Sequence, residues 1–242
     1  MIFAIVHFNT PELTTCLCSS ILKNHYDAKI IIFDNSDKRP FINAEIFNSE
    51  YVDNTKGQII DFEKELSKFP NKDIEDQLKS GCNFGSVKHS MSIDWLCKNI
   101  KDEFILLDSD VLLKRPIDFV NNNYICVSDV IKITSEVSRI CPMLAYINSK
   151  KMKEKHISFF DENRMHSLTK ANTKYKYYDT GASFFEDITN IGLFKQINTS
   201  DYFIHYGNGS WRKGDKISSD SEHKHADEPF KIWLLKNKQY WL

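Results

Sequence analysis

Two aspartates separated by one residue, Asp108 and Asp110, are the side chains whose types and spacing most directly suggest chemistry. They follow the apolar run of residues 104–107, and apolar residues resume directly after them. Alternate side chains of an extended strand share a face, so both carboxylates can point the same way. Two like charges so close are costly unless a divalent cation or a shared proton relieves the repulsion, and oxygen-bound Mg²⁺ or Mn²⁺ is a natural occupant. The stretch is equally compatible with an acidic turn that caps a buried strand.

The composition sets limits on the function. The 242 residues are 41% hydrophobic and 27% charged, as in globular proteins, and a net charge of −1 argues against nucleic acid as the main partner. The six cysteines form no Cys-x-x-Cys pair, so we expect reduced, mostly buried thiols rather than a zinc site or disulfides. No apolar run reaches transmembrane length and the first residues lack a basic leader, which predicts a cytoplasmic protein.

The first half of the chain alternates predicted strands and helices. Strands are expected at 2–8 and 29–33, and a strand with its turn at 51–55. Helices are expected at 11–23, 59–69 and 86–99, with a turn at 81–85, before the acidic strand. Thr10 is the expected N-cap of the first helix. This alternation predicts an α/β fold whose polar loops gather at the carboxyl ends of the strands, where open sheets bind ligands.

The second half is less regular. Strands are expected at 124–130 and 143–148, and a glycine turn at 179–182 leads into a helix. His205 ends a short apolar run ahead of a glycine-rich turn, and the tail 230–242 is aromatic and basic. We see no linker or repeat and therefore expect one domain.

Several segments carry a resemblance to a known family. Residues 5–13, Ile-Val-His-Phe-Asn-Thr-Pro-Glu-Leu, resemble the opening of family 2 glycosyltransferases of the GT-A fold, and residues 34–37, Asp-Asn-Ser-Asp, resemble their loop that holds the nucleoside of a sugar nucleotide. Residues 83–85, Asn-Phe-Gly, are similar to the family's segment ahead of the acidic strand, and Asp-Ser-Asp at 108–110 matches its Asp-x-Asp motif. The resemblance is good over 2–113 and loose beyond. It implies a single Rossmann-like GT-A domain with a mixed central sheet, in which 1–113 binds the nucleotide sugar and 114–242 the acceptor.

The resemblance also implies a set of binding residues. Mn²⁺ or Mg²⁺ on the donor diphosphate would be held by Asp110, with Asp108 and His205 as further candidates, since carboxylate and imidazole suit these ions. Residues 205–211 resemble in addition the late His-x-x-Gly stretch of retaining family 8 transferases, but lack that family's Lys-Pro-Trp ending. The nucleotide sugar itself would be contacted by His7, Asn9, Asp34, Asn35, Asn83, Lys88, Asp108 and Trp211. Core packing is the competing interpretation for His7 and Trp211, and solvent exposure for Lys88.

An inverting transferase needs a base that takes the proton of the acceptor hydroxyl. Family 2 enzymes often place it in an acidic pair at a helix start, which makes Glu186 and Asp187 candidates. Simple matching of the helix dipole is the alternative for that pair. Asp179 is a third candidate, although Asp-Thr-Gly-Ala at 179–182 also resembles the Asn-x-Gly segment that contacts the donor sugar in retaining enzymes.

The predicted function is transfer of a sugar from a nucleoside diphosphate, UDP favoured, to a glycan or lipid-linked acceptor, by inversion. The abundance of Lys, Asn and Ile associates the chain with bacterial surface polysaccharide synthesis. The basic aromatic tail could touch the inner face of a membrane, and a C-terminal helix packed on the core is the favoured alternative for it. Three rivals remain. They are a retaining family 8-like transferase, an inactive sugar-nucleotide-binding protein, and a haloacid-dehalogenase-like phosphatase that would use the acidic strand and Asp215 or Asp220.

Overall fold

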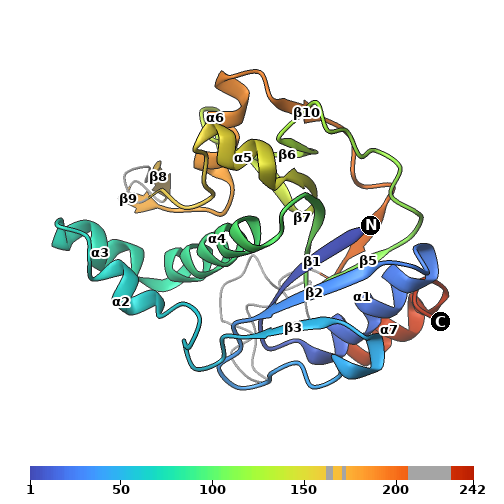
Figure 1. The fold of residues 1–242 in the computed structure, drawn as a ribbon. Coiled ribbons are helices and arrows are strands. Elements are labelled where there is room, and N and C mark those ends of the chain that lie inside the picture. Colours follow the sequence, from blue (N-terminus) through green and yellow to red (C-terminus); the bar gives the residue numbers. More distant parts are fainter. Residues whose placement is uncertain (162–165, 171–172, 207–229) are drawn as a thin grey trace.

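A seven-stranded mixed sheet in the order β10-β6-β7-β4-β1-β2-β3 organises the chain (Figure 1). The structure is a computed structural model that describes residues 1–161, 166–170, 173–206 and 230–242. The strands are β1 (Ile2–His7), β2 (Lys29–Asp34), β3 (Glu50–Asp53), β4 (Glu103–Asp108), β6 (Cys126–Lys132), β7 (Ser138–Asn148) and β10 (Phe194–Gln196). The first four run parallel, whereas β7 runs antiparallel to both β4 and β6. The predicted α/β class with a mixed central sheet is confirmed.

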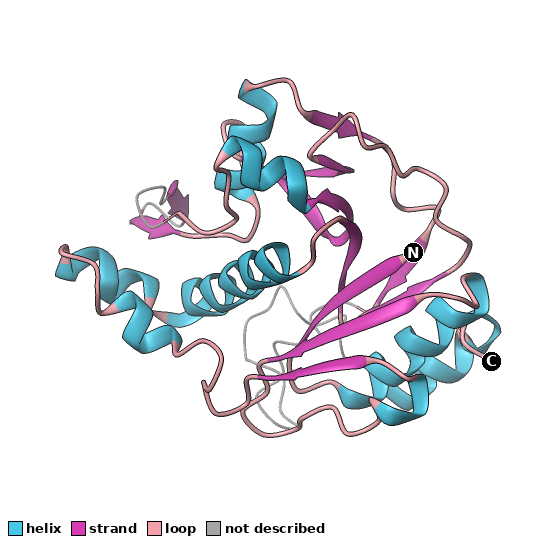
Figure 2. Cartoon of the chain, in the orientation of Figure 1, coloured by secondary structure: helices cyan, strands magenta, loops and turns pink. Residues whose placement is uncertain are grey.

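Helices cover both faces of this sheet (Figure 2). On one face α1 (Pro11–Asn24) and the short strand β5 (Val111–Leu113) pack over Phe3 and Ile5 of β1. On the other, α4 (Gly81–Asn99), α5 (Ser149–Lys155) and α6 (Ala182–Asn190) pack over Ala4 and Val6. The two-residue period of a strand thus sends β1 side chains into two separate hydrophobic layers, as expected of a strand buried on both faces.

The remaining elements are short. They are η1 (Glu45–Phe47), α2 (Phe62–Leu66), α3 (Lys72–Leu78), the β8 (His166–Lys170) and β9 (Thr173–Tyr177) hairpin, β11 (Phe203–His205), α7 (Phe230–Lys236) and η4 (Lys238–Tyr240). The C-terminal segment lies beside α1 in Figure 1, where Nζ of Lys23 donates a 2.7 Å hydrogen bond to the carbonyl of Gln239. β11 pairs antiparallel with β5, and this pairing matters for the site.

The expected turn at 81–85 is wrong, because α4 begins at Gly81 and includes it. The side-chain amide of Asn83 explains the difference. It donates to the carbonyl of Gln77 (3.1 Å) and accepts from the backbone N–H of Tyr178 (3.0 Å). Tertiary contacts therefore fix the first helical turn despite two glycines of low helix propensity.

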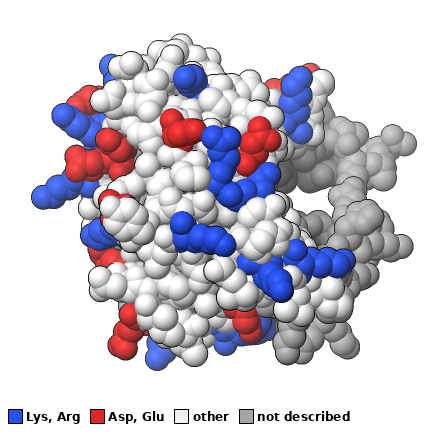
Figure 3. All heavy atoms as spheres, turned by 90° about the vertical axis from the view of Figure 1, so that its right-hand side faces the viewer, with Lys and Arg blue, Asp and Glu red and all other residues white. Residues whose placement is uncertain are grey.

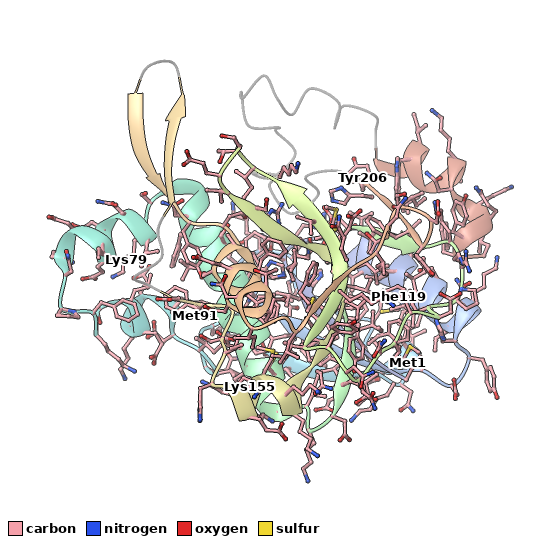
Figure 4. The ribbon with its side chains drawn as sticks, turned by 90° about the horizontal axis from the view of Figure 1, so that it is seen from above. Met1, Lys79, Met91, Phe119, Lys155 and Tyr206 are labelled. Carbon is pink, nitrogen blue, oxygen red and sulfur yellow. The ribbon has the colours of Figure 1, made fainter. Side chains whose placement is uncertain are left out.

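The cysteines are as expected, so far as the structure describes them. Five cysteines, at 16, 18, 97, 126 and 141, are buried free thiols. No helix in the described part of the chain is long and apolar enough to cross a membrane. On the face shown in Figure 3, basic and acidic side chains are interspersed with uncharged surface, in keeping with the net charge of −1.

Candidate functional site

Four parallel strands end at the same edge of the sheet, and each ends in a polar residue. The register pairs His7 of β1 with Asp34 of β2, Asp34 with Asp53 of β3, and Val6 with Asp108 of β4. The polar loops predicted from the sequence therefore do meet at the carboxyl edge, where open α/β sheets bind ligands.

Asp108, the last residue of β4, faces the helix α4. Its Oδ1 lies 3.2 Å from Nε2 of His89. Burial raises the pKa of Asp108; His89 opposes this shift and the charge of Asp110 adds to it. His89 follows the predicted Lys88 directly but was assigned no role from the sequence, because helical spacing alone does not say which of two neighbours faces the sheet.

Asp110 is brought against His205 by strand pairing. His205 of β11 stands opposite Val111 of β5, and the backbone N–H of Tyr206 donates a 2.9 Å bond to the carbonyl of Asp110. Nε2 of His205 then lies 3.2 Å from Oδ1 of Asp110. Burial lowers the pKa of His205, but the hydrogen bond and charge of Asp110, with the charge of Asp108, raise it overall.

The predicted metal ligands form two pairs rather than one cluster. Among the described residues, no three His, Cys, Asp or Glu side chains make an assembled metal centre, since Asp108 contacts His89 while Asp110 contacts His205. The donor set still fits a hard divalent cation, because it offers carboxylate oxygens and an imidazole nitrogen. Burial is the main cause of the raised pKa of Asp108 and the charge of Asp110 adds to it, and a bound cation would favour the ionised carboxylate.

Ser109, the middle residue of the acidic motif, is linked to the opposite loop. Its hydroxyl lies 3.0 Å from that of Thr10, and both side chains are buried. Thr10 does occupy the position before α1, but its side chain makes no capping hydrogen bond, so that part of the prediction is wrong. The hydroxyl pair instead ties the end of β1 to the acidic turn.

Asp34 and His7, predicted to meet the nucleoside, are buried inside the loop they support. Asp34 accepts hydrogen bonds from the backbone N–H groups of Ser36 (2.8 Å) and Phe41 (2.7 Å), and from the hydroxyl of Tyr51 (2.8 Å). His7 pairs through Nδ1 with the hydroxyl of Thr14 at 2.7 Å, and burial lowers its pKa. Both side chains hold the loop in shape, and their contact with a ligand stays a prediction.

Asn35 and Asn9 also have protein partners. The amide of Asn35 donates to the hydroxyl of Ser92 (2.6 Å) and accepts from Asn54 (2.9 Å). Asn9 has a φ of 55°, a left-handed conformation that Asn tolerates. Its Oδ1 accepts the backbone N–H groups of residues 38 (3.1 Å) and 39 (3.0 Å), so this side chain also organises the loop after β2.

Lys88 is held at the edge between α4 and the end of β1. Its Nζ lies 4.9 Å from the ring centre of Phe8 and 5.1 Å from that of Phe84. Burial lowers its pKa, whereas the charges of Asp37 and Glu63 act in the opposite direction. Lys88 is therefore not the solvent-facing residue that the competing interpretation expected.

Asp179, the third candidate base, is paired with a residue that sequence reasoning missed. Its Oδ2 lies 2.9 Å from Nε of Arg139 on β7. Glu186 and Asp187 do not start α6 as predicted, because the helix begins at Ala182 and has no acidic residue in its first turn. Dipole matching in a first turn therefore does not apply to them. Trp211, Asp215 and Asp220 lie outside the described residues.

Comparisons with known proteins find several solved structures that are similar to this chain. No family model matches the chain, and no curated protein does. The galactosyltransferase LgtC, solved with donor and acceptor sugar analogs, is 11% identical with a TM-score of 0.45, over 93% of this chain and 83% of that one. The bifunctional WbbM is 10% identical with a TM-score of 0.49, over 82% of this chain and 39% of the WbbM chain. GlyE of Streptococcus pneumoniae TIGR4 is 10% identical with a TM-score of 0.46, over 82% of this chain and 45% of the GlyE chain. All three are glycosyltransferases.

Proposed function

We propose that this protein is a metal-dependent GT-A glycosyltransferase that moves a sugar from a nucleoside diphosphate, UDP favoured, to a glycan or lipid-linked acceptor. The observation that carries the proposal is the acidic motif at the end of the central strand β4, with His205 of a distant strand against Asp110. In this view residues 1–113 bind the donor and 114–242 the acceptor. Synthesis of a bacterial surface polysaccharide is the proposed context.

The chemistry follows from the charges involved. In the transfer, the oxygen of the acceptor hydroxyl bonds to the anomeric carbon, and the bond from that carbon to the phosphate oxygen breaks. The electron pair leaves on the diphosphate, and the hydroxyl proton passes to a base. Mn²⁺ or Mg²⁺, when bound, supplies Lewis-acid stabilisation to the departing diphosphate. Asp110 and His205 would hold the ion, and Asp108, partly buried against His89, would face the ribose or sugar.

We propose inversion, because the likeness to family 2 covers more of the chain than the likeness to family 8. Glu186 and Asp187 then remain the candidate bases, since Asp179 is engaged with Arg139. The anomeric configuration of the product, read by NMR, decides between the mechanisms. Retention would instead support the family 8-like alternative.

A binding screen tests the proposal. Sugars linked to UDP, GDP, CMP and TDP are added to the protein with Mn²⁺ or with EDTA, and the thermal midpoint is measured. At least one nucleotide sugar should raise the midpoint in Mn²⁺ only, because a ligand that binds the native state stabilises it by mass action. If no nucleotide sugar changes the thermal midpoint in either condition, the proposed function is contradicted.

Two alternatives have their own readouts. A haloacid-dehalogenase-like phosphatase would release phosphate from a generic aryl phosphate, and the proposed transferase would release none. Here β4 lies centrally, after three other strands of the sheet, whereas in that family the acidic strand opens the domain. Tight metal-dependent nucleotide binding without turnover on a broad acceptor panel would favour an inactive binding protein.

We also propose that the C-terminal segment rests on the cytoplasmic face of an anionic membrane, near a lipid-linked acceptor. Leu235 and Leu242 are 66% and 77% exposed, and Lys236 and Lys238 are exposed beside them. Apolar side chains flanked by basic ones suit the surface of an anionic bilayer. Sedimentation with vesicles containing phosphatidylglycerol should capture the protein, and Leu235→Ser should weaken capture; equal recovery with neutral vesicles would contradict the charge argument.

A further inference from the structure

Arg139 lies on the part of β7 that extends past the end of β4. Leu107 of β4 pairs with Leu144, so the start of β7 continues beyond the acidic strand and pairs there with β6, Arg139 standing opposite Ile131. Its side chain is 20% exposed. The register therefore sets Arg139 past the end of β4, on the side of the acidic motif, and its positive charge opposes the net rise in the pKa of both Asp108 and His205.

The Arg139–Asp179 ion pair is fixed by tight backbone packing. Gly181, two residues after Asp179, has a φ of +81°, and a Cβ there would lie 2.7 Å from Cγ1 of Ile140, the neighbour of Arg139. The residue between Asp179 and Gly181 is Thr180, and its hydroxyl donates a 3.3 Å hydrogen bond to the carbonyl of Ser86. The turn is therefore pressed against β7 and α4, so the carboxylate of Asp179 is held close to the guanidinium.

Within the described ranges, the guanidinium of Arg139 meets a single carboxylate, that of Asp179. Nε lies 2.9 Å from Oδ2 of Asp179, but the geometry is that of an ion pair and not of an aligned hydrogen bond. In the described part of the chain, no other acceptor is bonded to Arg139. A mostly buried guanidinium with N–H groups that no described residue accepts is typical of a group that meets an anionic ligand, because its planar fork matches carboxylate or phosphate geometry.

We propose that Arg139 binds the sugar-linked phosphate of the donor, and that Asp179 is the positioning residue that holds the guanidinium in place. The proposal rests on the proposed function. The carboxylates of the acidic motif at the end of β4, together with Asp179, would repel a diphosphate, and Arg139 offsets the charge of Asp179 through its 2.9 Å contact. Asp179 then orients Arg139, and it does not take the acceptor proton.

Calorimetric titration separates the phosphates. UDP, GDP, CDP and TDP are tested in Mn²⁺ to find the diphosphate that binds the wild type, and the matching monophosphate is tested beside it. Arg139→Gln should lower the affinity for the diphosphate about 10- to 100-fold. It should change the affinity for the monophosphate less than about twofold, since the lost charged hydrogen bonds reach only the distal phosphate. Arg139→Lys should recover part of the loss. The control Arg115→Gln removes an exposed arginine paired with Asp118 and should change neither affinity.

The outcomes separate the two claims. If no diphosphate binds the wild type, the proposed function fails. If a diphosphate binds but Arg139→Gln leaves its affinity intact, or weakens both ligands equally, the assignment of Arg139 is overturned and the function stands. Asp179→Asn should also lower the affinity for the diphosphate, because Asp179 positions Arg139. Unchanged affinity with activity abolished would instead make Asp179 the base.

Discussion

Nε2 of His205 lies 3.2 Å from Oδ1 of Asp110, although the two residues are far apart in the sequence. The contact arises because β11 pairs with β5 directly after the acidic motif. It joins the second half of the chain to the strand that ends the first half. The pair brings together two of the three predicted metal ligands, whereas Asp108 contacts His89.

Replacing His205 should weaken metal-dependent nucleotide binding. His205→Asn removes the imidazole donor, and we expect the affinity for UDP in Mn²⁺ to fall at least about tenfold, while affinity in EDTA stays unchanged. Titration calorimetry measures both. His156→Asn is the matched control, because His156 is exposed and its φ of 54° suits Asn. An equal loss in the two variants would contradict a role for His205.

Adding one methyl group at Gly181 should destabilise the fold and loosen the Arg139–Asp179 pair. The new Cβ would lie 2.7 Å from Ile140 at a φ of +81°, so Gly181→Ala should cost about 2–4 kcal/mol of unfolding free energy. Gly192→Ala is the control, since Gly192 has a φ of +68° but nothing within 4 Å of a Cβ, and should cost only about 1 kcal/mol. Urea denaturation gives both values, and equal costs would refute the packing argument.

The buried hydroxyl pair of Thr10 and Ser109 should show energetic coupling. Thr10→Ala and Ser109→Ala each leave one buried hydroxyl without its partner, so the double variant should be about 1 kcal/mol more stable than the sum of the singles predicts. Ser109→Ala combined with Thr189→Ala should be additive, because the hydroxyl of Thr189 donates to the carbonyls of Phe185 and Glu186 in its own helix. Additivity in the first pair would mean that the loops are not linked through this contact.

Asp94 should make stability depend on pH. Burial raises its pKa to about 6 from 3.8, even though it accepts the N–H groups of Phe159 and Phe160. The folded state therefore binds the proton more tightly, and stability falls as pH rises through about 4 to 6, by an order of 3 kcal/mol. Asp94→Asn should remove this part of the slope in urea denaturation, and Asp102→Asn, an exposed position, should not. Identical slopes in Asp94→Asn and the wild type would refute the assignment.

Much of the fold could be predicted because its signals are local. The apolar runs of β1, β2 and β4 and the Pro11 helix start mark a parallel α/β unit, and the acidic motif marks its carboxyl edge. The start of α4 was missed because Asn83 is bonded to residues outside that helix, which no local pattern reports.

The site was predictable only in part, because some of its contacts join residues that are far apart in the sequence. Asp110 and His205 were identified by residue type, and strand pairing then brought them together. Arg139 was missed, because it stands in a strand whose register sets its position and has no motif of its own. His7, Asp34 and Asn35 have hydrogen-bond partners within the protein, as buried polar groups need, and their contact with a ligand stays a prediction.

The most direct test of the central claim is the titration of UDP into Asp110→Asn in Mn²⁺. Asn keeps the shape of the side chain but lacks its charge, so metal-dependent binding should fall by about 100-fold or more, with the thermal midpoint nearly unchanged. Asp118→Asn, at an exposed ion pair, should bind as the wild type does. If Asp110→Asn binds UDP in Mn²⁺ as tightly as the wild type, the acidic motif does not hold the donor's metal and the account is contradicted.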